Sequence, residues 1–281
     1  MSSFWLWWQH LPERIDPVLL QLGPLQIRYY GLMYLSSFLV VYAVLVHRIK
    51  KEKLPYTAAQ CEDLIIWAVC GALAGGRIGY VLFYDFTYFA AHPLEVFWPF
   101  RKAEGMAMVG ISGLSYHGGL IGVFTATYLF CRRNKLPFWR FVDFFIPAVP
   151  LGYTCGRIGN FLNGELWGRV TTVPWGMYFP GAPTGQLRHP SQLYEALGEG
   201  VVLFLVLWAL RNKAVLRGYL FWVYVFGYGL ARFSIEFFRQ PDEHLGLLWA
   251  GLSMGQWLTL AMLVVPVLVF LSKPKQSGES S

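Results

Sequence analysis

Apolar stretches of roughly the length needed to cross a membrane recur along the whole chain, separated by short polar segments. A spanning helix needs about 20 mostly apolar residues. Glycines and arginines interrupt the second, fourth and sixth stretches. The pattern predicts an all-α, polytopic integral membrane protein, with residues 1–281 forming a single transmembrane domain. Its seven predicted transmembrane helices cover roughly residues 28–46, 64–83, 114–131, 144–162, 191–210, 218–237 and 253–271.

The composition excludes an ordinary soluble domain. Of the 281 residues, 56% are hydrophobic and only 14% are charged, whereas soluble proteins carry about 25% charged residues. The net charge of +7 is typical of basic cytoplasmic loops in such a chain, and we expect no nucleic-acid partner. The four cysteines form no C-x-x-C pair and the six histidines lack metal-ligand spacing. We therefore expect buried thiols and no metal site.

Lysine and arginine are distributed unevenly between the two predicted sides of the membrane. They concentrate after the first, third and fifth spans and in the C-terminal tail, for example in "HRIKKEK" at 47–53. Because such basic loops remain in the cytoplasm, the N-terminus is predicted to lie outside and the C-terminus in the cytoplasm. The aromatic-rich segment at residues 4–8 suits a position at the membrane interface.

Two long connections fall on the predicted outer side. The segment at about 84–113 contains "FTYFAAHPLEVFWPF", which is amphipathic and is predicted to form an arm lying on the membrane. The loop at about 166–189 contains "VPWGMYFPGAP" and is predicted to form a small periplasmic cap. Connections of this length often have a function in a compact protein.

Three arginines lie inside predicted spans, although charge in lipid is costly and is seldom retained without a use. Arg77, Arg157 and Arg232 are the 14th, 14th and 15th residues of spans that are predicted to run outward, which places them at one depth in the outer half of the bilayer. The nearby acids, Glu165 and Glu236, are too few to neutralise all three. A guanidinium matches phosphate, so we predict an anionic guest, a phospholipid headgroup. The alternative is pairing that only stabilises the helix bundle, and it is strongest for Arg77.

Other polar side chains fall at the same predicted level. His117 opens the third span beside two glycines, and the inner halves of the spans carry no comparable cluster. The predicted chemistry therefore lies near the outer leaflet. The remaining members of this layer are Tyr30, Asn160, Asn163, Glu165, Tyr228, Glu236 and Arg239.

Seven motifs along most of the chain resemble the bacterial prolipoprotein diacylglyceryl transferase family. The signature G-R-x-G-N-F-x-N-x-E is complete at 156–165. One departure is visible at 110–113, where this chain has Gly-Ile-Ser-Gly and many members read W-x-G-G. The motifs are "YYGLMY" at 29–34, "GGRIGYVLFY" at 75–84, "HGGLIG" at 117–122, "GRIGNFLNGELWGR" at 156–169, "RHPSQLYEALGEG" at 188–200, "GYGLARFSIEFFRQPD" at 227–242 and "SMGQ" at 253–256.

The resemblance implies a seven-span enzyme of the bacterial cytoplasmic membrane. Such enzymes catalyse the first step of lipoprotein maturation. They transfer the diacylglyceryl group of phosphatidylglycerol to the lipobox cysteine thiol of a prolipoprotein signal peptide, forming a thioether and releasing glycerol-1-phosphate. The implied partners are phosphatidylglycerol, the signal peptide and membrane lipid. No cofactor is implied, and we expect a monomer.

The family's essential positions carry over residue by residue. His117, Arg157 and Arg232 fall on catalytic positions. Histidine has an unperturbed pKa of about 6.5, so His117 is the predicted general base for the thiol, or else it positions substrate while the lipid-bound arrangement activates the thiol. The matched substrate-binding positions are Tyr30, Arg77, Tyr80, Asn160, Asn163, Glu165, Tyr228, Glu236 and Arg239.

Two rival classes account for the pattern less well. A transporter would continue polar residues through the inner halves of the spans, and the sequence has no such trail. An intramembrane serine protease would use "GISG" at 110–113 with a histidine on another helix. Ser112 and His117 are five residues apart on one segment, which is a poor spacing for one helix face.

Overall fold

The computed structural model describes residues 3–23, 25–96, 100–101, 107–108, 113–183, 185–240 and 251–272. The chain divides into two compact units. Unit 1 comprises residues 1–44 and 142–281, and unit 2 comprises residues 45–141. Residues 110–112, which carry the departure from the family pattern and the serine of the protease alternative, lie outside the described residues.

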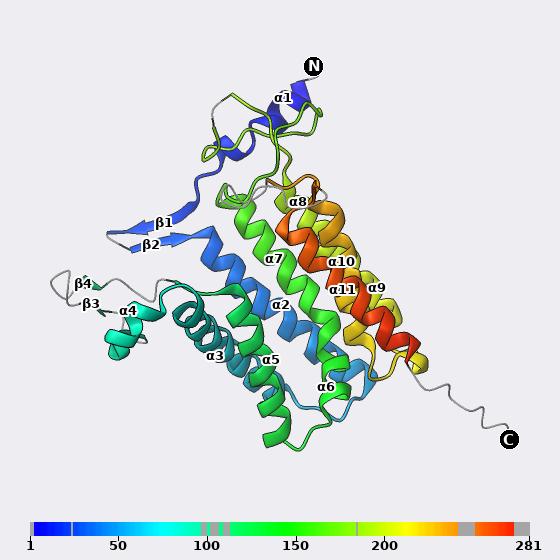
Figure 1. Ribbon diagram of the computed structural model, residues 1–281. Helices are drawn as coiled ribbons and strands as arrows, with labels where there is room; N and C mark the ends of the chain where they lie inside the picture. The colour runs from blue at the N-terminus through cyan, green and yellow to red at the C-terminus, as the bar shows by residue number, and fades with distance from the viewer. Residues whose placement is uncertain are drawn as a thin grey trace. The chain divides into compact units, whose positions relative to one another are not determined.

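Unit 1 is built around apolar helices that run side by side (Figure 1). Helix α2 packs its unit 1 portion on α7, where a side chain on Gly159 would lie 3.1 Å from Met33. The elements are α1 Ser3–Gln9, η1 Pro12–Arg14, β1 Val18–Leu22, β2 Leu25–Arg28, α2 Tyr29–Glu52, η4 Ile146–Ala148, α7 Val149–Leu162, α8 Ser191–Glu195, the π-helix η5 Ala196–Val202, α9 Leu203–Leu210, η6 Ala214–Leu216, α10 Leu220–Ile235 and α11 Met254–Leu271.

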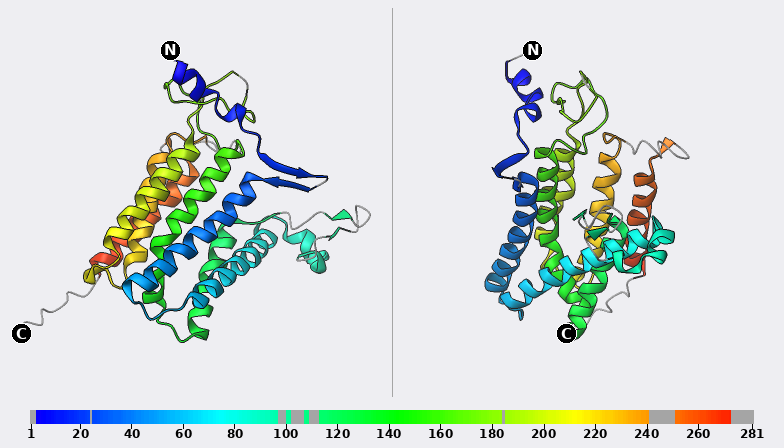
Figure 2. Two further views of the ribbon diagram at one scale, coloured as in Figure 1. Left: turned by 180° about the vertical axis from the view of Figure 1, so that it is seen from behind. Right: turned by 90° about the vertical axis from the view of Figure 1, so that its left-hand side faces the viewer.

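Unit 2 consists mainly of two long helices that pack on each other (Figure 2). Glycines at every fourth position of α3 face glycines of α5, and a side chain on Gly122 would lie 2.0 Å from the Gly71 carbonyl oxygen. Small residues therefore permit the close backbone approach that is common in membrane helix pairs. The elements are the end of α2, α3 Ala58–Phe83, α4 Phe86–Ala91, η2 Pro93–Val96, β3 Phe100–Arg101, β4 Ala107–Met108, α5 Tyr116–Arg133 and α6 Phe138–Phe145, which continues into unit 1.

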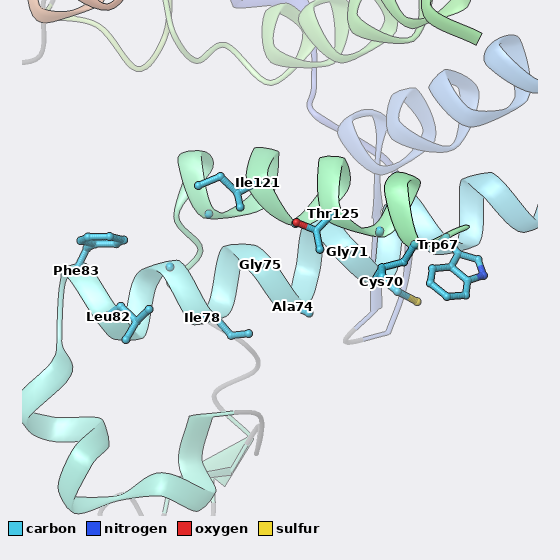
Figure 3. A pocket seen from close by; sticks show the side chains of 15 residues that line it. Trp67, Cys70, Gly71, Ala74, Gly75, Ile78, Leu82, Phe83, Ile121 and Thr125 are labelled. Carbon is cyan, nitrogen blue, oxygen red and sulfur yellow. The ribbon is translucent and has the colours of Figure 1, made fainter. Parts of the chain in front are cut away.

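An apolar cavity of about 510 Å³ lies along α3 and α5 (Figure 3). Its walls come from α3 and α5, and Trp67, Ile78, Leu82 and Ile121 line it. Cys70 is the one lining residue with an ionisable side chain. The cavity is thus a hydrophobic groove that does not contain the predicted charged residues.

The seven predicted spans fall on helical backbone. Four helical runs are long and apolar enough to cross a membrane by length and composition, and α10 is apolar but shorter. The fourth prediction, 144–162, differs most, because α6 ends at Phe145 and α7 begins at Val149 after the turn η4. Pro147 and Pro150 lie at this break, and proline lacks the amide donor that a continuous helix needs. The four runs are Tyr29–Glu52, Ala58–Phe83, Ser191–Leu210 and Met254–Leu271.

Local sequence determines where several helices begin and end. Thr57 and Ser253 form capping boxes with Gln60 and Gln256 at the starts of α3 and α11. Such reciprocal side-chain bonds satisfy amides that have no partner within the helix. Arg132 and Arg133 lie in the last turn of α5, where positive charge is favourable next to the helix dipole.

The purely helical prediction is wrong at two short segments. Strands β1 and β2 form an antiparallel hairpin in unit 1, and β3 pairs with β4 in unit 2. The predicted arm at 84–113 accordingly contains α4, η2 and this second hairpin. Strands of two to five residues are too short to appear in a hydropathy pattern that is averaged over a membrane span.

The predicted cap folds together with the N-terminal helix of unit 1. Trp8 Nε1 donates to the Trp175 carbonyl at 2.9 Å, and the Tyr178 amide donates to the Gln9 carbonyl at 2.8 Å. Met177 and Phe179 are buried in the apolar cluster beneath. The segment at 166–189 thus shares an apolar core with the N-terminal helix and the end of α7.

Candidate active site

Helices α7, α8 and α10 of unit 1 lie close to one another (Figure 1). A buried network of ion pairs joins these helical segments. Glu195 lies at its centre with 0% of its side chain exposed. Its carboxylate is 2.9 Å from Arg157 Nε, 2.9 Å from Arg232 Nη1 and 3.5 Å from Arg239 Nη1. One carboxylate therefore holds three guanidinium groups in a small volume.

Helix periodicity places these side chains on facing surfaces. Helix α7 contributes Tyr153, Arg157 and Asn160, which are spaced i, i+4 and i+7. Residues with this spacing share one helix face. Arg232, Glu236 and Arg239 repeat the same spacing along α10 and the turn that follows it. Three short stretches of sequence thus build the network.

Arg157 keeps one edge of its guanidinium available. Its Nε donates to the Tyr153 hydroxyl at 2.7 Å, and its Nη1 donates to Asn160 Oδ1 at 3.1 Å. Among the residues that the structure describes, Nη2 donates no hydrogen bond. The side chain is 18% exposed. On the Nη1–Nη2 edge, the side of a guanidinium that grips a phosphate in two-pronged fashion, Nη2 is therefore available to a ligand and Nη1 is shared with Asn160.

Arg232 is engaged by carboxylates on both of its terminal nitrogens. Nη1 lies 2.9 Å from Glu195 and Nη2 lies 3.0 Å from Glu236. Ser253, at the start of α11, donates to the other oxygen of Glu236 at 3.0 Å. Arg232 thus holds the acids in place, whereas Arg157 is oriented by them.

A second arm extends from Arg157 through amide and carboxylate groups. Asn160 Nδ2 donates to Glu165 Oε1 at 2.8 Å. The Tyr30 hydroxyl donates to Tyr34 at 3.2 Å. The network links six predicted positions, namely Arg157, Asn160, Glu165, Arg232, Glu236 and Arg239. Asn163 follows the last residue of α7, and its backbone amide donates to carbonyl oxygens of that helix. The Tyr228 ring packs edge-on against the Tyr153 ring, with 5.9 Å between the ring centroids.

Three members of the network were not among the predicted site residues. Glu195 and Glu199 come from the fifth span, and Tyr153 links Glu199 to Arg157. The expectation that the arginines outnumber their acids is wrong, since Glu195, Glu199 and Glu236 match Arg157, Arg232 and Arg239 in number. The sequence did contain a signal for the missed acids, because Glu195 and Glu199 lie four residues apart inside an apolar span, where charge is seldom kept without a use.

The other predicted site residues belong to unit 2. Arg77 is buried and donates to the carbonyl oxygens of Val96, Glu95 at 3.0 Å and Gly113 at 3.4 Å. Its guanidinium lies 4.8 Å from the Phe89 ring centroid. These contacts fit the packing alternative for Arg77. Tyr80 stacks on Tyr84 at 5.4 Å, and His117 is an exposed residue in the first turn of α5.

We expect Arg77→Lys to lower stability more than catalysis. Lysine keeps the charge but cannot reach three carbonyls with one planar group. Each buried acceptor that loses its donor costs about 1–3 kcal/mol. Thermal unfolding in detergent should show the loss, while turnover at a temperature where the variant is folded should fall less than tenfold. A folded variant with turnover as low as that of Arg157→Lys would contradict the packing interpretation.

The cap is joined to the network through main-chain pairing. The Arg169 amide donates to the Phe238 carbonyl at 2.9 Å, and Arg169 Nε donates to the Arg239 carbonyl at 2.8 Å. His189 lies beside this pairing with Nδ1 3.0 Å from the Tyr194 hydroxyl, and burial lowers the pKa of His189. The backbone position of Arg239 is thus set by the cap.

The fold and the network define a multi-pass helical membrane protein with a charged site buried among its helices. A sequence profile described as prolipoprotein diacylglyceryl transferase matches residues 17–272. The phosphatidylglycerol–prolipoprotein diacylglyceryl transferase of Chlorobaculum tepidum is 50% identical over 282 residues, covering 100% of this chain and 97% of the relative. The chain therefore belongs to the prolipoprotein diacylglyceryl transferase family.

Relatives from other bacteria show similar coverage. The proteins of the same name from Bordetella parapertussis and Idiomarina loihiensis are 49% and 46% identical. The alignments cover 92% of this chain and 95% of the first relative, and 96% of this chain and 97% of the second. The similarity thus extends over both units of the chain.

Proposed function

We propose that this protein transfers the diacylglyceryl group of phosphatidylglycerol to the lipobox cysteine of prolipoproteins. The products are a thioether-linked lipid on the protein and glycerol-1-phosphate. Family membership over nearly the whole chain supports the reaction. The observation that assigns this reaction to a site is the available guanidinium edge of Arg157 within a buried network of ion pairs.

Arg157 binds the phosphate of the lipid headgroup through this edge. Negative charge grows on the phosphate oxygens as the carbon–oxygen bond to the glyceryl group breaks. A fixed donor pair in a site of low polarity stabilises such charge without first having to reorganise. Arg232 adds a further positive charge to the site. It forms ion pairs with Glu195 and Glu236, and these two carboxylates keep Arg157 and Arg239 in place.

The remaining residues of the network shape the headgroup pocket. Asn160 and Glu165 offer an amide and a carboxylate, which suit the hydroxyl groups of the glycerol headgroup. Tyr30, Asn163, Tyr228 and Arg239 complete this proposed binding surface. For unit 2 we propose Tyr80 as a further substrate contact and His117 as one of two candidate acceptors for the thiol proton. No cofactor enters the proposed reaction.

We further propose the membrane arrangement. Seven spans cross the bacterial cytoplasmic membrane, with the N-terminus outside, the C-terminus in the cytoplasm and the site open toward the outer leaflet. The outer arm and cap belong to one monomeric transmembrane domain. The lipobox cysteine emerges at the outer end of its signal helix, so this orientation brings thiol and headgroup to one side.

Labelling with a membrane-impermeant thiol reagent tests this topology. In intact cells Tyr116→Cys and Val170→Cys should react more than the wild type, because both positions are well exposed at 72% and 53%. Val215→Cys, 60% exposed beside the basic residues that follow the fifth span, should react only after the membrane is opened. The reverse pattern would contradict the orientation.

The proposed reaction is tested with the purified protein in vesicles that contain phosphatidylglycerol. A lipobox peptide should gain the mass of one diacylglyceryl group, with release of glycerol-1-phosphate. The same peptide with serine in place of cysteine, and vesicles without phosphatidylglycerol, are the controls. If the cysteine peptide gains no mass when the protein is folded and inserted, the proposed function is wrong.

A further inference from the structure

The hydroxyl group of Tyr153 joins the phosphate-facing arginine to a buried acid. It accepts the hydrogen bond from Arg157 Nε at 2.7 Å and donates its own proton to Glu199. Glu199 is 1% exposed, whereas Tyr153 is only partly buried. Tyr153 therefore connects a substrate group that lies against Arg157 to the buried carboxylate of Glu199.

Of the three glutamates that form ion pairs with the arginines, Glu199 has the weakest ionic contacts. Glu195 has guanidinium nitrogens at 2.9, 2.9 and 3.5 Å. Glu236 has Arg232 at 3.0 Å and a hydrogen bond from Ser253. The nearest guanidinium nitrogen to Glu199 is Arg232 Nη1 at 3.9 Å. Ion pairing favours the charged form of an acid. Protonation of Glu199 therefore weakens fewer ion pairs than protonation of Glu195 or Glu236.

The backbone around Glu199 is built to bring it close to α7. Glu199 lies in the π-helix η5, a rare geometry that often occurs at functional sites. The next residue, Gly200, packs directly on α7, since a side chain there would lie 2.0 Å from Thr154 Oγ1. This close approach holds Glu199 within hydrogen-bonding distance of Tyr153.

We infer that the Tyr153–Glu199 pair receives the proton of the lipobox thiol during diacylglyceryl transfer. The inference rests on the proposed function. The thiol proton passes to the Tyr153 oxygen as the hydroxyl proton of Tyr153 passes to Glu199. The sulfur forms its bond to the glyceryl carbon, and the electron pair of the breaking carbon–oxygen bond stays on glycerol-1-phosphate. Glu199 then returns the proton, through Tyr153, to that phosphate.

This route keeps the charge of the site constant. The ion pairs join three arginines to three glutamates, and the lipid phosphate adds one negative charge. The leaving phosphate gains a second negative charge at the moment when Glu199 becomes neutral. The groups that face the pair are Arg157 on α7, Glu195 on α8, and Arg232 and Tyr228 on α10. Tyr153 is the catalytic group, and Glu199 acts through it.

The test compares Tyr153→Phe and Glu199→Gln with His117→Gln, because His117 is the other candidate for the same proton. Tyr128→Phe, which removes a hydroxyl group from an exposed residue of unit 2, is the matched control. Each protein is assayed in phosphatidylglycerol vesicles with a cysteine peptide across pH. Each is also assayed with a selenocysteine peptide, whose selenol is ionised at neutral pH without a base.

We expect Tyr153→Phe and Glu199→Gln to transfer to the cysteine peptide about 10²-fold more slowly at neutral pH, the lower end of the effect of losing a general base. Their rates should recover as the pH rises past about 8.5, where a free thiol ionises by itself. The selenocysteine peptide should restore near wild-type rates at neutral pH, and the KM for phosphatidylglycerol should not change.

Two results would overturn the inference. One is a wild-type rate at neutral pH in Tyr153→Phe. The other is a loss of equal size at every pH and with both peptides, which would show that the tyrosine only supports Arg157. If recovery appears in His117→Gln and not in Tyr153→Phe, His117 is the acceptor. Tyr153→Phe carries the test alone if Glu199→Gln does not fold. Wild-type transfer is recorded in parallel, so failure of the proposed function is seen separately.

Discussion

Replacing Arg157 with lysine is expected to remove most of the diacylglyceryl transfer while the protein remains folded. Lysine keeps the positive charge beside Glu195 but replaces the planar fork with a single ammonium group. In the wild type, one planar guanidinium can hydrogen-bond Asn160 and the phosphate at the same time through two different nitrogens. The single ammonium nitrogen of lysine cannot reproduce this arrangement. Loss of one fixed donor to a developing oxyanion typically lowers kcat by about 10²–10³-fold, and we expect a decrease in this range.

The measurement is the rate of peptide lipidation at saturating phosphatidylglycerol, with thermal unfolding recorded for each variant. Arg133→Lys, at an exposed position in the last turn of α5, is the matched control and should be unaffected. A folded Arg157→Lys protein with turnover within threefold of the wild type would show that the two-pronged grip on phosphate is not part of the reaction.

Glu195→Gln is expected to destabilise the protein by about 3–5 kcal/mol, the usual cost of removing one partner from a buried ion pair. Glutamine retains the size of the side chain but leaves Arg157, Arg232 and Arg239 around a neutral group. The network then carries excess positive charge in a site with no exposure at its centre. Transfer should also fall, because the orientation of Arg157 depends on this carboxylate.

Unfolding of Glu195→Gln should be measured with and without glycerol-1-phosphate. An anion that binds only the folded state raises stability, and the excess positive charge should make this gain larger in the variant than in the wild type. Glu13→Gln, at a position 46% exposed, should change stability by less than about 0.5 kcal/mol. A Glu195→Gln protein as stable as the wild type would show that the network does not support the fold.

The hydropathy pattern is sufficient to locate the main apolar helices of this protein. All seven predicted spans fall on helical backbone, because about 20 apolar residues in sequence satisfy their own hydrogen bonds only as a helix in lipid. The same pattern does not resolve the break between α6 and α7 or the two short hairpins. These depend on single prolines and on pairing over a few residues.

The convergence of Arg157 and Arg232 could also be predicted from the sequence. As the 14th and 15th residues of the fourth and sixth predicted spans, they are predicted to lie at one depth, and the structure joins both to Glu195. Arg77 belongs to unit 2, where its guanidinium donates to carbonyls of the segment that follows α3, and its part in the site stays a prediction. Depth alone does not tell which way a helix face points.

Only the tertiary structure decides which acids the arginines meet. Arg157 and Arg232 lie 38 and 37 residues from Glu195 along the chain, so the pairing depends on how three helices are rotated about their axes. The π-helix at Ala196–Val202 then changes the helical register around Glu199 and brings it to Tyr153. A rotation of this kind is set by packing between helices, such as Gly200 against Thr154, and leaves no periodic signal in the sequence of any one helix.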